Sequence, residues 1–319
     1  MSGEANTLPR HPAADEGLLK RLWIYQEDRF PIFKTAILLA VFSAASISVS
    51  AHLADRSLPG IWVFVAVWLV ALIIFFQMRA CDEFKDLEDD RTYRPERPIP
   101  SGLVSLSLIL KLAAFGAVLA IALTASIYLW LLVPLLGVWL WLALMTHEFF
   151  VADWLKARWG LYLVSHMAIM PLIDLYITAA EWLPHSNGPP AGLWLFLALS
   201  FANGCVLELG RKTWSPESER PGVETYSALL GPTRAVWLWV AVCAVAWLLL
   251  AGVGLAVRAP LSVAGPGLIM LLVVVFFAQR FSQYPTVKGQ KGIDTLAGLW
   301  VFACYCLAGF APFIATGFQ

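Results

Sequence analysis

Three aspartates that follow an apolar stretch are the residues of this sequence best suited to metal chemistry. Asp82, Asp86 and Asp90 are spaced four residues apart in the segment RACDEFKDLEDDRTYRPERPIPSG, residues 79–102. On a helix each step of four residues turns about 400°, so the three carboxylates would share one face. Like charges on one face repel one another, and a divalent cation would offset that repulsion. Carboxylate oxygens suit Mg²⁺, which commonly bridges to the phosphates of a substrate.

Arginines flank the same segment. Arg79, Arg94 and Arg97 could bind phosphate oxygens in a bidentate manner. A solvated charged loop is the alternative interpretation. Against it, the acids directly continue an apolar helix, and a proline-rich stretch leads straight into the next apolar run. We therefore predict a site for Mg²⁺ and a phosphorylated substrate.

The segment resembles the first signature of the UbiA-type intramembrane prenyltransferases, an aspartate-rich motif followed by a basic residue and RPxPSG. The resemblance places Asp82, Asp86 and Asp90 on the three aspartates of the signature, and residues 97–102 on its tail. Cys81 stands where the family usually has asparagine. A role of that asparagine amide is therefore not carried over, whereas the metal-binding carboxylates are.

A second acidic loop follows the sixth apolar run, where members of this family carry their second motif. In NGCVLELGRKTWSPESERPGVETYSALLG, residues 203–231, Glu208 ends the apolar run just as Asp82 ends an earlier one. The family's order of acids, then glycine, then threonine is present. However, Lys212 occupies the position four residues after Glu208, where the family pattern would have an acid.

The resemblance implies roles for five charged residues of this loop. Glu208 would bind a second metal ion together with Glu217 or Glu219, and Arg211 and Lys212 would contact a diphosphate directly. A hydrophilic turn is the alternative for Glu217 and Glu219. The predicted residues are, for catalysis, Asp82, Asp86, Asp90, Glu208 and Lys212; for substrate binding, Arg79, Arg94, Arg97, Arg211, Lys212 and Lys288; and for the metal, Asp82, Asp86, Asp90, Glu208, Glu217 and Glu219.

The implied activity is Mg²⁺-dependent transfer of a prenyl group from an isoprenoid diphosphate to a hydrophobic acceptor, which is aromatic for most members of the family. A membrane terpene cyclase that acts on the prenyl diphosphate alone is an alternative, because the second motif departs from the family pattern. A transporter is another. Transporters place polar groups near the membrane midplane, whereas the acids here lie in loops.

Three further polar residues have open roles. Asp174, inside the fifth apolar run, is either a functional residue of the bundle interior or a hydrogen-bond partner of a neighbouring helix. His166 could orient or deprotonate an acceptor, or be structural. Lys288 lies in a predicted basic loop between the last two spans, which either closes over the substrate or reflects membrane orientation alone.

Composition decides the environment of these residues. The chain is 60% hydrophobic and 14% charged, whereas soluble domains carry roughly 25% charged residues. The apolar surplus indicates a lipid bilayer, and a net charge of zero gives no basic field for nucleic acid. The five cysteines form no metal-binding pattern and are interpreted as packing residues, except Cys81, which lies within the first acidic segment.

Nine apolar runs are long enough to cross a bilayer, so an all-α membrane bundle around a central cavity is expected. The predicted spans are 31–51, 59–78, 104–124, 126–146, 161–180, 191–207, 234–257, 262–280 and 293–316. We expect residues 1–30 to be a cytoplasmic segment and residues 31–319 the prenyltransferase-like membrane domain. Residues 1–30 lack an apolar signal region, so the first span is expected to direct insertion.

Charge predicts the orientation. Of the 22 lysines and arginines, 19 fall in segments that are cytoplasmic if the N-terminus is inside, and only Arg56 and Arg258 fall in the opposite segments. Positive residues concentrate on the cytoplasmic side of membrane proteins. The sequence therefore predicts both acidic loops at the cytoplasmic face, in a bacterial inner membrane.

Overall fold

The computed structural model describes residues 10–186 and 188–316. In this part of the chain the regular elements are all helical, which confirms the predicted fold class. Among the described residues, nine helical segments are long and apolar enough to cross a membrane, also as predicted. They are α2 (Ile32–Leu53), α3 (Ile61–Lys85), α5 (Leu106–Ile127), α6 (Leu132–Thr146) preceded by the 3₁₀ turn η1 (Leu129–Leu131), α8 and α9 (Trp159–Met167 and Ile169–Trp182), α10 (Leu193–Arg211), α12 (Pro232–Ala256), α13 (Pro260–Gln283) and α14 (Val287–Thr316).

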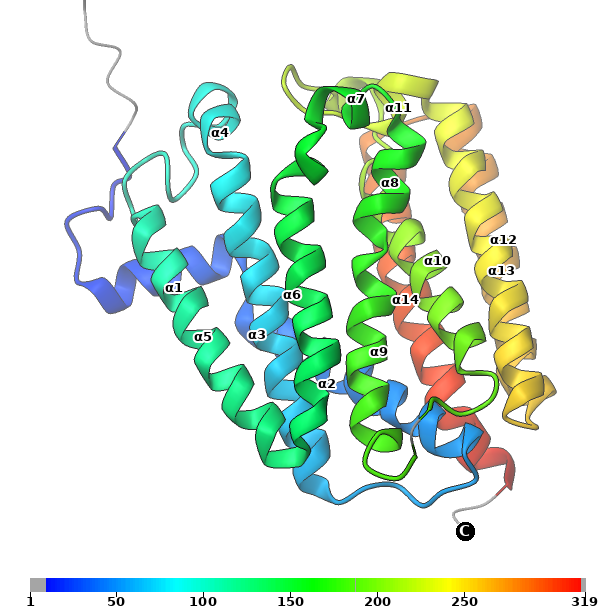
Figure 1. Cartoon of the computed structure of the whole chain (residues 1–319). Helices are drawn as coiled ribbons and strands as arrows, with labels where there is room; N and C mark the ends of the chain where they lie inside the picture. The colour runs from blue at the N-terminus through cyan, green and yellow to red at the C-terminus, as the bar shows by residue number, and fades with distance from the viewer. Residues whose placement is uncertain (1–9, 187, 317–319) are drawn as a thin grey trace, which may run out of the picture.

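Short helices lie outside these spans. Three of them, α4 (Leu87–Tyr93), α7 (Ala152–Lys156) and α11 (Tyr226–Leu230), lie at one end of the bundle, which is the upper end in Figure 1. The fourth, α1 (Leu18–Arg29), lies across the bundle near α3 and α5. Because α3 and α10 also end at the upper end, both acidic loops lie on the same side of the molecule.

The helix ends follow local chemistry. The Ser105 hydroxyl caps α5 by accepting a hydrogen bond from the backbone N–H of Leu108, and Pro232 occupies the first turn of α12. The fifth span breaks at Ala168, between α8 and α9. Pro171 cannot donate to the carbonyl of Met167, four residues earlier, so a continuous helix would lose a hydrogen bond there.

Two spans differ from their predicted bounds in ways that affect the site. Helix α3 continues past the predicted end at residue 78 to Lys85, so Asp82 lies within its last turn. Helix α14 begins at Val287, before the predicted start at residue 293. The prediction that Lys288 lies in a loop is therefore wrong, because Lys288 is in the first turn of α14. The ends of these two helices are polar, so the apolar runs in the sequence are shorter than the helices themselves.

A polar network joins four spans deep in the bundle. Asp174 on α9 is fully buried and accepts hydrogen bonds from the hydroxyls of Ser46 on α2, at 2.7 Å, and Tyr305 on α14, at 2.5 Å. Tyr305 also lies 3.2 Å from the Ser200 hydroxyl on α10. Of the two interpretations of Asp174, the structure thus supports a partner of neighbouring helices, as expected for an acid at membrane depth.

Candidate active site

The first acidic motif spans the end of one helix and the start of the next. Helix α3 ends at Lys85, Asp86 lies in the turn, and α4 begins at Leu87. The prediction that the three aspartates share one face of a continuous helix is therefore wrong, because the chain leaves α3 at Asp86. The Asp82 side chain is 51% exposed, whereas Asp90 is only 2% exposed.

Asp90 is held by arginines. Its carboxylate accepts hydrogen bonds from Arg97 at 2.7 Å and from Arg94 at 3.1 Å. The Ser101 hydroxyl donates to the backbone carbonyl of Arg97 at 2.6 Å, which fixes the turn that presents this arginine. The structure therefore engages Asp90, Arg94 and Arg97 with one another, where the sequence predicted a metal ligand and two phosphate ligands.

Asp82 and Asp86 remain available for a metal ion. Arg79 lies 3.7 Å from the Asp82 carboxylate, and the Asp86 side chain forms no ion pair with the described residues. Within residues 10–186 and 188–316 no three His, Cys, Asp or Glu side chains are grouped as a metal site. Mg²⁺ usually needs only one or two carboxylates, completed by waters and substrate phosphates. The donor set of Asp82 and Asp86 therefore fits Mg²⁺.

The second acidic loop does not bring its three glutamates together. Glu208, in the last turn of α10, pairs with Lys212 at 2.8 Å. The Glu219 carboxylate accepts the hydroxyl hydrogen of Thr225 at 2.8 Å, and Glu217 is exposed in the 3₁₀ turn Pro216–Ser218. Thr225 also caps α11. Among the predicted acids of this loop, Glu208 is the one that ends a membrane helix beside the site, and Glu219 orders the loop.

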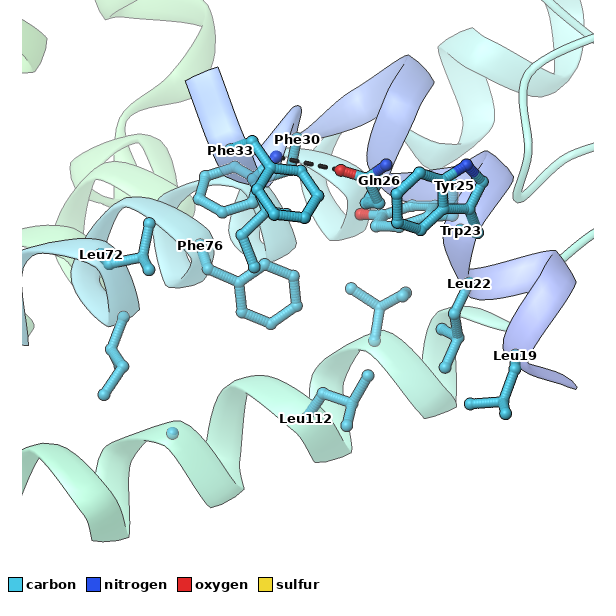
Figure 2. A pocket seen from close by; sticks show the side chains of 14 residues that line it. Leu19, Leu22, Trp23, Tyr25, Gln26, Phe30, Phe33, Leu72, Phe76 and Leu112 are labelled. Atoms are coloured by element: carbon cyan, nitrogen blue, oxygen red, sulfur yellow. Dashed lines mark hydrogen bonds between the residues drawn. The ribbon is translucent and has the colours of Figure 1, made fainter. Parts of the chain in front are cut away.

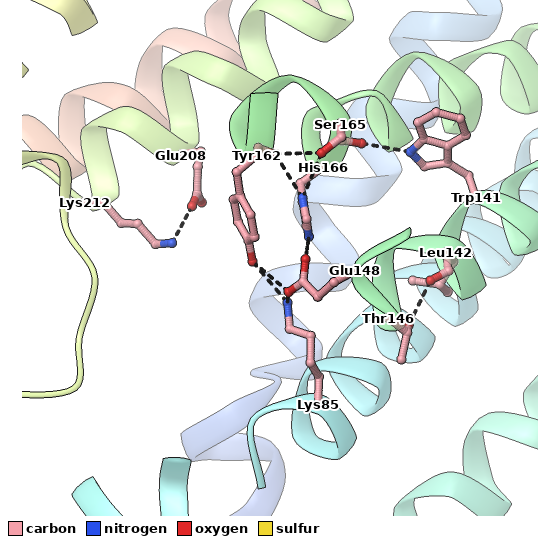
Figure 3. Close-up of polar contacts among 10 residues, drawn as sticks. All are labelled: Lys85, Trp141, Leu142, Thr146, Glu148, Tyr162, Ser165, His166, Glu208 and Lys212. Carbon is pink, nitrogen blue, oxygen red and sulfur yellow. Dashed lines mark hydrogen bonds and ion pairs between the residues drawn. The ribbon is translucent and has the colours of Figure 1, made fainter. Parts of the chain in front are cut away.

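A third cluster of polar side chains lies beside the two acidic motifs, and the sequence did not predict that its members would meet. Lys85 from α3, Glu148 from the loop after α6, and Tyr162 and His166 from α8 meet between the two motifs (Figure 3). One Glu148 oxygen lies 3.1 Å from the Lys85 ammonium and accepts the Tyr162 hydroxyl hydrogen at 3.2 Å. The other oxygen lies 3.3 Å from Nε2 of His166. Glu148 thus orders three side chains from two helices.

A left-handed turn points Glu148 into this cluster. Glu148, Phe149 and Phe150 have φ values of 48°, 53° and 60°. Each L-residue in this conformation costs roughly 1–2 kcal/mol, and such strain concentrates at functional sites. A polar residue after an apolar run was the only sequence signal for Glu148, and nothing in the sequence announces a left-handed turn of three residues without glycine.

Lys85 and Glu148 form an ion pair at the centre of the cluster. Burial favours the neutral acid, but the hydrogen bond from His166 and the charge of Lys85 outweigh it, and the pKa of the Glu148 carboxyl falls from 4.5 to about 2. Nδ1 of His166 lies 2.9 Å from the carbonyl oxygen of Tyr162, and Nε2 faces the carboxylate. The Lys85 ammonium thus pairs with the ionised Glu148 carboxylate beside the His166 ring.

Two members of the cluster connect it to both motifs. His166 lines a small cavity of about 30 Å³ together with Asp82, Lys85 and Thr146. Tyr162 of the same cluster lines a second cavity together with Lys212, which pairs with Glu208. Acids from α3 and α10 therefore flank the Lys85 ammonium and the His166 ring at one end of the bundle, an arrangement suited to binding a metal ion and a polyanion.

A larger cavity has almost entirely apolar walls and no charged side chain on them. It has a volume of about 490 Å³ and lies between α1, α3 and α5, with apolar side chains such as Trp23, Phe76 and Leu112 on its walls (Figure 2). Its one drawn hydrogen bond joins the Gln26 side-chain oxygen to the backbone N–H of Ile32 at 3.0 Å. The absence of charged groups on its walls separates it from the candidate active site.

The chain matches the model of the UbiA prenyltransferase family over residues 40–302. The chain belongs to the UbiA prenyltransferase family. It is an integral multi-pass membrane protein and an enzyme of that family. A comparison with curated protein sequences finds no match.

Solved structures share the UbiA fold at low identity. A UbiA homologue from Aeropyrum pernix K1, in its apo form, has a TM-score of 0.63 at 19% identity, covering 83% of this chain and 96% of the homologue. A structure described for digeranylgeranylglyceryl phosphate synthase has a TM-score of 0.61 at 14% identity, covering 91% and 98%. A UbiA homologue from Archaeoglobus fulgidus, bound to GPP and Mg²⁺, has a TM-score of 0.50 at 10% identity, covering 87% and 98%.

The register of the UbiA signature NDxxDxxxD differs here by one residue. The signature spaces its aspartates three and then four residues apart, whereas Asp82, Asp86 and Asp90 are spaced four and four. Glu83 occupies the position that the signature spacing gives to its first aspartate. Glu83 is buried and accepts a hydrogen bond from Nε of Arg29 at 2.6 Å. The structure thus turns Asp82 toward the small cavity and Glu83 toward α1.

The two acidic loops of this UbiA-family protein touch at Gly222. This residue has a φ of +75°, and its Cα lies against the ring of Tyr93 on α4, so a Cβ there would overlap the ring. The loop is also tied to α14, because the backbone N–H of Ser215 donates to the Gln290 side chain at 3.0 Å. The contact of Tyr93 with Gly222 joins the two loops over the site.

Replacing Gly222 by alanine is expected to separate the loops. The left-handed backbone would cost roughly 1–2 kcal/mol, and the methyl group would displace the Tyr93 ring. We expect a several-fold loss of activity and faster proteolysis between residues 212 and 225. Limited proteolysis and diphosphate release would measure both. Gly298→Ala is the control, because Gly298 is helical and a Cβ there meets open space. Equal behaviour of the two variants would contradict the assigned contact.

Proposed function

We propose that this protein transfers a prenyl group from an isoprenoid diphosphate to a hydrophobic acceptor, in a Mg²⁺-dependent reaction at the cytoplasmic face of the membrane. The observation that carries the proposal is that Asp82 and Glu208 flank the cluster of Lys85, Glu148, Tyr162 and His166 at one end of the bundle. The homologue from Archaeoglobus fulgidus, bound to GPP and Mg²⁺, supports the choice of donor and metal. The charge bias of the loops supports the cytoplasmic face.

Asp82 and Asp86 would hold Mg²⁺, and Glu208 would act from the opposite helix. A bound Mg²⁺ would neutralise phosphate oxygens and stabilise a departing diphosphate. Lys85, and Lys212 once released from Glu208, would add positive charge around the same phosphates. Arg79 and Arg211 lie at the ends of the two helices and are proposed to assist. Arg94 and Arg97 are proposed to act indirectly, through Asp90.

The bond changes balance without a redox partner. The C1–O bond of the prenyl diphosphate breaks, and its electron pair leaves with the diphosphate. The acceptor then donates an electron pair to C1 and loses a proton, which the released diphosphate takes up. Glu148 keeps Lys85, Tyr162 and His166 in place during these steps. An aromatic acceptor is proposed, since most members of the family use one.

The test is diphosphate release by detergent-purified protein with geranyl, farnesyl and geranylgeranyl diphosphates, with Mg²⁺ and with excess EDTA. We expect release that requires Mg²⁺ and an acceptor, and a prenylated acceptor in the product mixture. A cyclic hydrocarbon or alcohol from the prenyl diphosphate alone would instead assign a terpene cyclase. Absence of Mg²⁺-dependent release with every donor and acceptor would refute the enzymatic proposal.

A further inference from the structure

The apolar cavity between α1, α3 and α5 is open to the side of the bundle (Figure 2). Its volume of about 490 Å³ is typical of small-molecule sites. Trp23, Phe33 and Leu112 line it and are 50%, 67% and 38% exposed, so its walls continue into the outer surface of the bundle. Because α3 and α5 are membrane-spanning helices, lipid borders this opening, and a hydrocarbon chain of the bilayer can enter it.

The shape of this cavity suits an extended chain. Ile109, Leu112 and Gly116 line it from one face of α5, so the cavity follows this helix over about 10 Å. A Cβ at Gly116 would lie 3.0 Å from Ile73 of α3, so the two spans close the cavity at that end. Helix α1 covers the other end, where Tyr25 and Ile109 belong to one buried cluster. The long axis of the cavity therefore runs along the spans, as the chains of a bilayer do.

Two lysines without ion-pair partners adjoin the walls. Lys34 follows Phe33 in the first turn of α2, and Lys111 precedes Leu112 in the second turn of α5. Both lysines are exposed, and neither forms an ion pair with the residues that the structure describes. A lysine near the end of a span extends its ammonium group toward the head-group layer, where anionic lipids attract it. The charge beside the cavity therefore favours a lipid with an anionic head group.

Two hydrogen-bond donors on the walls are unused by the protein. The Tyr25 side chain is only 2% exposed, and its hydroxyl has no hydrogen-bond partner among the described residues. The Gln26 side-chain oxygen accepts from the backbone N–H of Ile32, but its amide nitrogen donates to none of the same residues. Buried polar groups are normally satisfied. The ester and phosphate oxygens of a phospholipid are acceptors for such donors, whereas a bare hydrocarbon offers none.

Helix α1 connects this cavity to the first acidic motif. Nε of Arg29, at the end of α1, donates to Glu83 at 2.6 Å, and Glu83 is the neighbour of Asp82 in the last turn of α3. Nε of Arg21 donates to the backbone carbonyl of Leu103 at 2.5 Å, just after the turn that presents Arg97 to Asp90. A ligand that fills the space between α1 and α5 would therefore hold α1 against both ends of the motif.

We propose that this cavity binds one acyl chain of an anionic phospholipid of the surrounding membrane, and that the bound lipid regulates the enzyme by holding α1 against the first acidic motif. Lys34 and Lys111 bind the head-group phosphate, and the apolar walls pack against the chain. The lipid site is independent of the proposed prenyl transfer. Only the effect of the lipid on the reaction rate rests on that proposal.

The first test is native mass spectrometry of the detergent-purified chain titrated with dioleoyl phosphatidylglycerol. Dioleoyl phosphatidylcholine is the counterpart with the same chains and no net charge. We expect the anionic lipid to bind about tenfold more tightly. Lys34→Gln and Lys111→Gln should each weaken its binding about fivefold, since each removes one attraction to the phosphate. Lys291→Gln is the matched control, because Lys291 is an exposed lysine of α14 that does not line the cavity; it should bind like the wild type.

A bulky side chain locates the acyl chain. Leu112→Trp fills part of the cavity without changing its charges, and we expect it to weaken binding of phosphatidylglycerol about tenfold. Leu119→Trp is the control, because Leu119 lies two turns further along the same exposed face of α5 and does not line the cavity. Thermal unfolding of both variants shows whether either substitution disturbs the fold.

The second test measures the coupling through α1. The protein is reconstituted in phosphatidylcholine vesicles and in an equimolar mixture with phosphatidylglycerol. We expect the anionic lipid to slow hydrogen exchange of residues 18–29 and 97–104 several-fold, and to raise the rate of Mg²⁺-dependent diphosphate release several-fold. The double variant Lys34→Gln with Lys111→Gln should show neither response, whereas Lys291→Gln should show both.

Equal binding of the two lipids, or equal binding by Leu112→Trp and Leu119→Trp, would overturn the lipid site. Displacement of phosphatidylglycerol by geranylgeranyl diphosphate would assign the cavity to a prenyl chain instead. Selective binding with unchanged hydrogen exchange of α1 would refute the regulatory coupling. Absence of diphosphate release in both kinds of vesicle, with lipid binding and exchange as expected, would count against prenyl transfer alone. The two proposals can therefore fail separately.

Discussion

Asp82→Asn is expected to lower the rate of diphosphate release by about 10³-fold while the protein keeps its thermal stability. Electrostatic groups that act on a developing anion contribute about 10²–10³-fold each, and loss of a carboxylate that holds Mg²⁺ also weakens metal binding. The Asp82 side chain is half-exposed and pairs only loosely with Arg79, at 3.7 Å. Its removal therefore breaks no strong contact of the fold. A Mg²⁺ titration of activity and a thermal unfolding curve would measure both effects.

Asp90→Asn, in the same motif, is expected to lower the stability of the fold, whereas Asp82→Asn lowers activity and leaves stability unchanged. Asp90 is buried and held by Arg94 and Arg97. Removal of one partner of a buried ion pair destabilises a protein by about 3–5 kcal/mol, and the partial exposure of both arginines favours the lower figure. Asp89→Asn is the matched control, because Asp89 is exposed beside it. Full stability of Asp90→Asn with lost activity would show that Asp90 acts at the metal.

The sequence alone predicted the number of spans, and it predicted that both acidic motifs lie on the same side of the membrane bundle. Apolar runs and helix length determine spans largely independently of tertiary contacts, and Asp82 and Glu208 each follow shortly after the end of a predicted span. The ion pairs within the first motif could not be predicted from the sequence. The chain leaves α3 at Asp86, and arginines seven and four residues later capture Asp90. The pairing of Arg97 with Asp90 depends on the conformation of the turn formed by residues 97–101, which brings Arg97 back toward α4.

The cluster of Lys85, Glu148, Tyr162 and His166 could not be predicted from the sequence, for a related reason. Its members come from α3, the loop after α6, and α8, and they are brought together by a left-handed turn that costs free energy locally. Periodicity and propensity describe favourable local structure, so a strained turn stabilised by Lys85 and His166 leaves no pattern. Glu148 could be recognised only as a polar residue near a helix end.

Glu148→Gln is expected to lower kcat about 10²-fold with a smaller change in KM for the prenyl diphosphate. The amide keeps the shape of the carboxylate but cannot accept hydrogen bonds at both ends. If its N–H donors turn toward Lys85, they face another donor, and if they turn toward His166, Lys85 loses the charge of its partner. The cationic groups would lose their fixed positions, and positional errors of this kind typically reduce rates by about 10²-fold. Steady-state kinetics with donor and acceptor varied separately would give both parameters.

Glu148→Asp distinguishes charge from shape. It keeps the carboxylate and shortens the side chain, so it should retain more activity than Glu148→Gln if the charge positions Lys85 and His166. If the glutamate only filled space in the turn, glutamine would be the better replacement. Equal kcat for the wild type and Glu148→Gln would contradict a positioning role altogether.

Acid unfolding offers an independent measure of the same ion pairs. The pKa of the Glu148 carboxyl is lower in the folded protein, about 2, than its ordinary value of 4.5. The unfolded chain therefore binds this proton first as the pH falls, so the pairing with His166 and Lys85 stabilises the fold above about pH 4.5 and is lost toward pH 2. The difference in stability between wild type and Glu148→Gln should thus be constant above pH 4.5 and shrink below it. A difference that did not change with pH would mean that the charge of Glu148 contributes nothing, and that the strained turn is stabilised by packing of the phenylalanines alone.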